Sequence, residues 1–409
     1  MIIGLQKSAG NRTVTAMIQR YDAFEHAKAG DRAAGKRTIT VGGSTLTSGE
    51  INALADLYGS PDDLLKADPS ELKALVALVR RQVAGGTVAE SEWDRASGGR
   101  YTQLNLKNSP HFAPRNSTII NPPSGSPTPG PDHLTTFTRF YTETVKAIQD
   151  SQLESDPVKK QALADRSTAT AGFAEHYLMD AFSAGHLFNK DDFIEKLRTN
   201  LDTLAPANLT ALFNSVAMGV IADKKSKDLL DDYETVDTHY GFHPNFSRPA
   251  AFQGLLEQLY KDPDGRQAVY SGLVKVVHDQ LSNNPAGAGA VGVDVENKFE
   301  KWVLSGDRTL DKSADSQRII TKALEQFRAV LDDLRSAPRS LRSPTEDIAK
   351  VTDYFPKPTA ASQVAIARMV TKATDAAASG TGAALVDILK VELPSILDAL
   401  EKRGKIKKA

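Results

Sequence analysis

Capped segments with a helical repeat occupy most of this sequence, and they restrict the chain to a mainly helical fold. The stretch DPSELKALVALVRRQVAGG shows the pattern: Asp68 is an N-cap, Pro69 takes the first helical position and Gly85 ends the apolar repeat. We therefore expect a mainly α protein built as a multi-helix bundle. The same pattern predicts further helices at 133–150, 155–187, 191–203, 207–222, 248–260, 266–283, 313–336, 359–376 and 382–402.

Two short hairpins and one long loop interrupt the helical pattern. TITVGGSTLT predicts a hairpin around its two adjacent glycines, within a segment, residues 21–47, that is otherwise mixed and turn-rich. Alternating valines at 291–295 predict a small second hairpin, whose returning strand contains residues 302–304. The stretch NPPSGSPTPGPD is too rich in proline and glycine for a regular element, so residues 97–133 are expected to form a long loop.

The glycine-rich stretch GAGAVG, residues 287–292, matches the spacing G-x-G-x-x-G of dinucleotide-binding loops. It follows a predicted helix and precedes a predicted strand, which is the reverse of the order that cradles a phosphate. We therefore expect a flexible loop and no dinucleotide. The patterns together divide the chain into a leader and turn-rich segment (1–47), a helical domain with the candidate chemistry (48–311) and a C-terminal helical extension (312–409).

Composition excludes several classes of function. The chain has no cysteine, so disulfides and thiolate chemistry are excluded, and any transition-metal site has to use His, Asp and Glu. A net charge of −1 provides no general attraction to nucleic acid or to an anionic membrane. The most apolar window, AALVDILKVELPSILDAL, contains charged residues and a proline, so no transmembrane segment is expected.

The stretch FAEHYLMDAFSAGHLF, residues 173–188, places three metal-type ligands in an apolar helix. His176 and Asp180 are four residues apart and therefore share one helix face. His186 follows Gly185, where the helix can bend or end and so return the second imidazole toward the first pair. The small residues 183–185 would allow another helix to pack closely. Imidazole and carboxylate groups suit Zn²⁺, and the alternative is a hydrogen-bonded polar core.

The pattern H-x-x-x-D-x-x-x-x-x-H resembles the central motif of the zinc-dependent phospholipase C and single-strand nuclease superfamily. The surrounding FAEHYLMDAFSAGHL is similar to FAEHFLTDAFAAGHL of a bacterial branch of that superfamily. Further motifs of the branch are resembled, in the same order, by GEINALADLYGSP (49–61), NSPHF (108–112) and VHDQLSNN…VGVDVENKFEKWVLSGD (277–307). The resemblance implies an all-helical fold of the phospholipase C type, with zinc ions held by His and Asp side chains. It says little about residues 312–409.

The resemblance also implies roles for individual residues. The metal ligands that it indicates are His176, Asp180, His186, His278 and His111. A carboxylate that is not a ligand, Asp56 or Asp279, would take the proton from a water molecule and is the expected catalytic base. Asp279 directly follows His278 and points about 100° away from it on a helix. Both can therefore serve one site only if the helix is frayed, or if one residue binds the metal and the other only hydrogen-bonds to a ligand.

The sequence departs from the family pattern in two places. The branch usually has a histidine in the helix after the NSPHF-type motif, where this chain has Glu143 or Thr144, and the superfamily's amino-terminal tryptophan ligand has no counterpart. We therefore expect one or two zinc ions. A second histidine pair, His239 and His243, would chelate a metal only if HYGFH were helical, and its glycine and the following proline favour a loop.

The resemblance implies a metal-dependent phosphodiesterase, either phospholipase C-like or nuclease-like. The substrate, a phospholipid or a nucleic acid, is left open by the sequence. The alternative is a catalytically inert structural or adaptor protein that keeps the fold and has lost the metal cluster.

The N-terminal stretch LQKSAGNRTVTAMIQR, residues 5–20, resembles the LQRxAGNRAV leader of proteins associated with bacterial extracellular contractile injection systems. Thr13 departs from that pattern, which usually has alanine. The resemblance implies that residues 5–20 contact the tube or the loading factors of such a particle. The protein would then be a cargo toxin, made in the bacterial cytoplasm without a Sec signal, loaded and released. The alternative is a short amphipathic helix without a targeting role.

Overall fold

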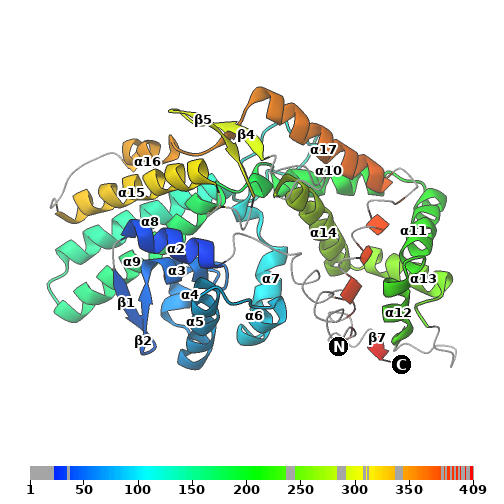
Figure 1. Ribbon diagram of the computed structural model, residues 1–409, viewed down its shortest axis with the longest axis horizontal. Helices are drawn as coiled ribbons and strands as arrows, with labels where there is room; N and C mark the ends of the chain where they lie inside the picture. Colours follow the sequence, from blue (N-terminus) through cyan, green and yellow to red (C-terminus); the bar gives the residue numbers. More distant parts are fainter. Residues whose placement is uncertain are drawn as a thin grey trace.

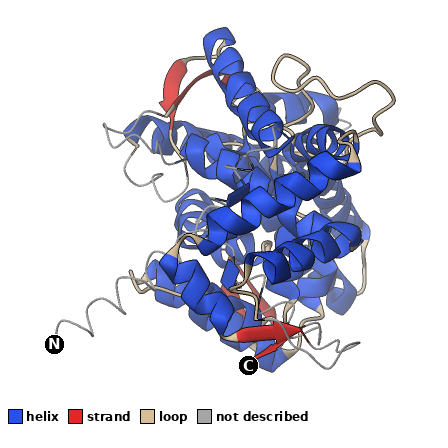
Figure 2. Cartoon of the chain, turned by 90° about the vertical axis from the view of Figure 1, so that its right-hand side faces the viewer, coloured by secondary structure: helices blue, strands red, loops and turns tan. Residues whose placement is uncertain are grey.

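The computed structural model describes residues 23–34, 37–235, 245–282, 292–306, 310, 313–336 and 344–378, together with single residues and short runs between 382 and 408. Helices fill the body of the molecule and the strands lie at its margins (Figure 1 and Figure 2). The expected mainly α fold is confirmed, and its assignment to the phospholipase C type stays a prediction. The leader, residues 5–20, and the pair His239 and His243 lie outside the described residues.

The N-terminal part packs short helices around a hairpin. Its elements are α2 (Ala23–Ala34), β1 (Thr38–Val41), β2 (Ser44–Thr47), α3 (Ser48–Leu54), α4 (Pro61–Leu65) and α5 (Pro69–Val83). The first predicted hairpin is confirmed, with Thr38 opposite Thr47 and Val41 opposite Ser44. Residues 21–47 were predicted to be mixed and turn-rich, and this prediction is wrong for residues 23–34, which form the helix α2.

Helix α2 forms because small residues let it pack closely on α3. A Cβ added at Gly49 of α3 would lie 1.9 Å from the carbonyl oxygen of Ala27, and one added at Gly30 of α2 would lie 2.9 Å from the Cα of Gly49. The two helices therefore approach closely at these glycines. This contact buries one face of α2, which the polar sequence of the helix did not predict.

The central part contains the long antiparallel pair of helices at the left of Figure 1. Its elements are α6 (Glu90–Ala96), α7 (Arg100–Leu106), the 3-10 turn η1 (Ser109–His111), α8 (His133–Leu153), α9 (Pro157–Asp180) and the 3-10 turn η2 (Ala184–His186). Caps set the starts of α8 and α9, because the side chains of Asp132 and Asp156 accept hydrogen bonds from first-turn amides. The predicted loop at 97–133 is interrupted by α7 and η1, and the predicted helix 155–187 ends early, at Asp180.

The remaining elements complete the body. They are α10 (Lys190–Asp202), α11 (Pro206–Ile221), α12 (Lys224–Asp231), β3 (Tyr233–Thr235), α13 (Pro249–Lys261), α14 (Pro263–Ser282), β4 (Val293–Glu296), β5 (Lys301–Leu304), α15 (Ala314–Ser336), α16 (Pro344–Thr352), β6 (Lys357–Pro358), α17 (Ala360–Ala378) and β7 (Ile406–Lys408). The second predicted hairpin is confirmed as β4–β5, and β6 adds a third strand beside β4. Strand β7 pairs with β3.

Helix α15 packs against α2, α8 and α9, so part of the predicted C-terminal extension contacts the helices that carry the candidate site. Helix α17 packs against α10 and α14 (Figure 1). In the part of the chain that is described, no single helix has the length and apolar character needed to cross a membrane. The helices α10 and α11 meet these length and composition criteria only when they are taken together, and the chain bends by 113° between them.

Candidate metal centre

Six histidines fall within the described residues, and all six are buried. They come from separate elements, so only the tertiary structure brings them near one another. The buried histidines are His26 on α2, His111 in η1, His133 at the start of α8, His176 on α9, His186 in η2 and His278 on α14. Two buried carboxylates join them, Asp180 at the end of α9 and Asp56 in the turn that follows α3.

The Asp180 carboxylate is at the centre of this cluster and is fully buried. Its Oδ2 lies 2.6 Å from Nδ1 of His111 and 3.2 Å from Nε2 of His176. Its Oδ1 lies 3.7 Å from Nε2 of His26 and 3.9 Å from Nδ1 of His186. Each oxygen thus faces two imidazoles, which is an arrangement in which a carboxylate can bind one metal ion or bridge two.

His176 connects two groups of possible ligands. Its Nε2 lies 3.3 Å from Oδ1 of Asp56 and 3.3 Å from Nδ1 of His111. Its ring also stacks on the ring of His26, with centroids 4.3 Å apart. Ligand atoms of His26, Asp56 and His176, and likewise of His111, His176 and Asp180, lie within 4.8 Å of one another. The predicted ligands His111, His176 and Asp180 therefore converge, and Asp56 joins them.

His186 returns toward Asp180 at η2, as the spacing predicts. Its Nδ1 lies 3.0 Å from the main-chain carbonyl oxygen of Asp180. The expected close packing at the small residues is also present, since a Cβ added at Gly185 would lie 2.4 Å from Cδ2 of His278. The rings of His186 and His278 have centroids 5.2 Å apart. His278 therefore lies at the edge of the cluster, next to His186.

The two predicted catalytic carboxylates have different surroundings. Asp56 is buried and contacts His176, as described above. Asp279 lies outside that group: its Oδ1 is 3.0 Å from Nδ1 of His278 and its Oδ2 accepts a hydrogen bond of 2.6 Å from Nζ of Lys275. Asp279 is therefore placed to orient the His278 ring, a common role for a carboxylate beside a metal-binding histidine.

His26 was not predicted from the sequence. A signal was present, because His26, Gly30 and Ala33 recur at helical spacing in AFEHAKAGDRAA. The face is made of small and polar residues, however, so it lacks the bulky apolar repeat that marks a buried helix. Its burial depends on the close approach of α3 at Gly49.

Thr144 is, with Glu143, one of the two residues that this sequence offers where the resembled branch usually has a histidine. It is buried on α8, and its hydroxyl donates a hydrogen bond of 2.7 Å to the carbonyl oxygen of Phe140. The hydroxyl is therefore engaged by its own helix, as threonine commonly is in a buried helix. This contact is consistent with fewer ligands than a three-metal site requires.

The donor set of the cluster fits a divalent transition metal. Neutral imidazoles and carboxylates are ligands for Zn²⁺, and neighbouring ligands on a tetrahedral zinc lie roughly 3.3 Å apart, given bond lengths of about 2.0 to 2.1 Å. The separations from Nε2 of His176 to Asp56, His111 and Asp180, between 3.2 and 3.3 Å, match that spacing. His111, His176 and Asp180 form one group that would hold such an ion, and His26, Asp56 and His176 form a second group around the same His176 ring. Nδ1 of His111 and Oδ2 of Asp180 lie closer than zinc ligands do, at the 2.6 Å of a hydrogen bond.

His133 lies beside the cluster and has an unusual electrostatic environment. Burial lowers the pKa of His133 to about 3, and the nearby His186 acts in the same direction. The ring packs edge-on against Phe355, with centroids 5.7 Å apart. His133 is therefore neutral in the folded protein at any pH near neutrality.

We expect this buried neutral His133 to make the protein less stable in acid. Below pH 6.5 the unfolded chain binds a proton at this residue, whereas the folded chain does so only as the pH approaches about 3. The stability present above pH 6.5 is therefore lost progressively as the pH falls between these values. His133→Phe should remove this loss, and its stability relative to the wild type should rise by about 2 kcal/mol between pH 7.5 and pH 5.

Denaturant unfolding of both proteins at several pH values, with chelator present so that metal loss does not contribute, measures this difference. A difference between the two proteins that stays constant with pH would contradict the prediction.

Comparison of the sequence with models of protein families finds no match, and comparisons with curated proteins and with solved structures find none either. The function is therefore inferred from side-chain geometry and from the motifs of the chain itself.

Proposed function

We propose that this protein is a metal-dependent phosphodiester hydrolase. The observation that carries the proposal is the buried Asp180 carboxylate, whose two oxygens face four imidazoles from four separate elements. Neutral imidazoles that converge on one carboxylate are the donor set that suits a divalent transition metal. A divalent ion such as Zn²⁺, when bound, supplies Lewis-acid stabilisation of the charge that develops on a phosphoryl oxygen.

Side chains of this protein would bind the metal, accept a proton from water and orient a ligand. Asp180, His111 and His176 hold the centre of the site, and their burial excludes bulk water from it. Asp56 lies at the rim of the cluster with 7% of its surface exposed, so it is the carboxylate placed to accept a proton from an incoming water molecule. Asp279 holds His278 in orientation through the contact at Nδ1.

Hydrolysis of three phosphodiesters tests the proposal: bis(p-nitrophenyl) phosphate, phosphatidylcholine vesicles and single-stranded DNA. Protein loaded with zinc is expected to cleave the first and one of the other two, which identifies the substrate class. Asp56→Asn should lower kcat by about a hundredfold or more with a smaller effect on KM, as expected for loss of a general base. Arg198→Ala, which changes a surface pair with Glu195, is the control and should leave the rate unchanged. Zinc-loaded protein that cleaves none of the three would refute the proposal.

The hydroxyl of Thr144 donates its hydrogen bond within α8, to the carbonyl oxygen of Phe140, so it does not replace a histidine ligand. This observation favours a second candidate, an inert structural or adaptor protein with the same fold. The same assay together with metal analysis separates the two, because an inert protein that has lost the metal cluster would bind no zinc and would leave all three phosphodiesters intact.

We further propose that the hydrolase is cargo of a bacterial contractile injection system. The support is the resemblance of residues 5–20 to the leaders of proteins associated with such particles. Deletion of residues 1–20 ends two residues before α2 begins at Ala23, so the helix that carries His26 is left complete. The truncated protein should keep its metal content and thermal stability and should be lost from purified particles. Particles that contain as much truncated as full-length protein would rule out the targeting role.

A further inference from the structure

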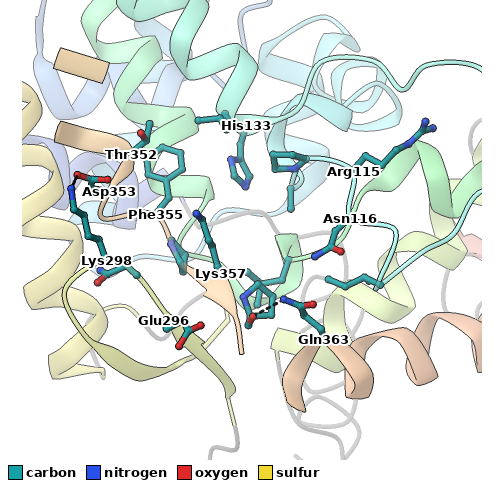
Figure 3. A pocket seen from close by; sticks show the side chains of 18 of the residues that line it. Arg115, Asn116, His133, Glu296, Lys298, Thr352, Asp353, Phe355, Lys357 and Gln363 are labelled. Carbon is teal, nitrogen blue, oxygen red and sulfur yellow. Dashed lines mark hydrogen bonds and ion pairs between the residues drawn. The ribbon is translucent and has the colours of Figure 1, made fainter. Parts of the chain in front are cut away.

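A cavity of about 830 Å³ lies next to the metal centre, between the chain that follows η1 and the β4–β6 side of the small sheet. Figure 3 shows the side chains that line it. Ala113 and Leu187 of the lining directly follow Phe112 and His186, so backbone next to the metal centre forms part of the cavity wall. A volume of several hundred Å³ is typical of small-molecule sites.

The lining combines apolar surfaces with a small excess of positive charge. Three cationic side chains and two carboxylates face the cavity, namely Arg115, Lys298, Lys357, Glu296 and Asp353. Two of the cations are already paired, Arg115 with Asp192 and Lys298 with Asp353. Among the described residues no carboxylate pairs with Lys357, so its ammonium is the positive charge left for a ligand.

His133 supplies a buried polar group at the same cavity. It is only 5% exposed, and its Nδ1 has no hydrogen-bond partner among the residues that the structure describes. Figure 3 shows its ring pointing into the cavity, close to Phe355. A neutral imidazole offers one donor and one acceptor, and leaving such a group unsatisfied in the interior is unfavourable. Nδ1 itself is fully buried, so a molecule bound in the cavity would make its polar contact with the exposed edge of the ring.

The apolar part of the lining surrounds these two polar groups. The rings and side chains that form it are Phe355, Ile119, Leu134, Leu187, Pro114, Pro356 and Pro358. Flat ring surfaces of phenylalanine and proline favour a ligand with an aromatic body. One unpaired ammonium favours a single negative charge, since a second charge would have no counter-ion that is not already paired.

We propose that this cavity binds a small aromatic monoanion, a carboxylate or sulfonate, with its charge at Lys357 and a polar contact to His133. The site is separate from the proposed hydrolysis and requires no metal. Its ligand is held by one ion pair and one hydrogen bond, and the aromatic body packs on Phe355. Binding next to His186 places this ligand where it contacts the wall of the metal centre.

Binding of 1-anilinonaphthalene-8-sulfonate to the full-length protein in chelator tests the proposal, with fluorescence as the readout. N-phenyl-1-naphthylamine, which has the same rings and no charge, is the matched neutral probe. Lys357→Met should weaken binding of the sulfonate about tenfold or more, as loss of a charge-assisted contact predicts, and should leave binding of the neutral probe unchanged. Lys357→Arg keeps the charge and should stay within about twofold of the wild type.

Two further variants locate the probe. Lys146→Met changes an exposed lysine on α8 that pairs with Asp150 and does not line the cavity, and it should not alter binding. His133→Phe keeps a ring in place, removes the hydrogen bond and should weaken binding several-fold. Absence of saturable sulfonate binding to the wild type, or equal loss in Lys146→Met and Lys357→Met, would overturn the proposal. Binding that Lys357→Met leaves unchanged would overturn it as well. Lys357 is exposed, so its variants are expected to fold.

Discussion

Asp180→Asn is expected to abolish stoichiometric metal binding. Asparagine has nearly the same volume as aspartate, so the substitution leaves no cavity. It removes the negative charge at the centre of the cluster and replaces one carboxylate oxygen by an NH2 group, which cannot bind a metal. Each oxygen of Asp180 faces two imidazoles, and the imidazoles are neutral ligands. Without the carboxylate only the neutral imidazoles of His111 and His176 would hold the dication at the centre of the site, so metal content measured after dialysis should fall from at least one ion per chain to a small fraction of that.

The same variant should lose the stabilisation that metal provides. A ligand that binds only the folded state stabilises it by RT ln(1 + [L]/Kd), which is about 4 kcal/mol at a thousandfold excess over Kd. Denaturant unfolding of the wild type with zinc and with chelator should differ by roughly that amount, and Asp180→Asn should show no difference.

Asp279→Asn is the matched control, because Asp279 contacts His278 and Lys275 rather than the central group. It should retain most of the metal-dependent stabilisation. A wild-type protein that binds no metal, or an Asp180→Asn protein that binds as much as the wild type, would reduce the cluster to a polar core.

Arg328→Met is expected to destabilise the protein by about 3–5 kcal/mol, the range observed when one partner of a buried ion pair is removed. Nε of Arg328 donates to Oε1 of Glu175, and both side chains are buried between α15 and α9. Burial raises the pKa of Glu175, and the Arg328 guanidinium opposes that rise. Loss of the guanidinium would leave Glu175 as an uncompensated buried acid directly next to His176.

A double variant distinguishes this cause from simple loss of packing. Glu175→Gln combined with Arg328→Met removes both charges, and its stability should recover by several kcal/mol relative to Arg328→Met alone. Arg318→Met breaks a surface pair with Glu300 and should leave the free energy of unfolding nearly unchanged. Denaturant titration at pH 7 measures all three variants. If Arg328→Met lowers the free energy of unfolding no more than Arg318→Met does, the inference that the buried pair contributes to stability is wrong.

The Glu175–Arg328 pair also shows how the C-terminal helices relate to the candidate site. Arg328 belongs to the segment predicted as an extension, and its partner precedes His176 on α9. Helix α15 packs against α2 as well, the helix that carries His26. A truncation that removes α15 would therefore disturb two helices of the metal centre.

Local patterns in the sequence determined much of this protein. Caps and periodicity predicted the long helices, and paired glycines and alternating valines predicted both hairpins, because these signals depend only on neighbours in the chain. The spacing of His176 and Asp180 predicted a shared helix face for the same reason. The turn that returns His186 to Asp180 was also predicted, since Gly185 and its small neighbours lie within the same stretch.

Only the tertiary structure decided which other residues join the site. His26 reaches His176 because α2 and α3 approach closely at Gly30 and Gly49, a contact between separate helices that no local pattern encodes. Asp56 and Asp279 looked equivalent in the sequence, and burial separated them: Asp56 contacts His176, whereas Asp279 pairs with Lys275 at the surface side of His278. Periodicity fixes the direction of a side chain on its own helix, but the distance between helices depends on packing across the whole core.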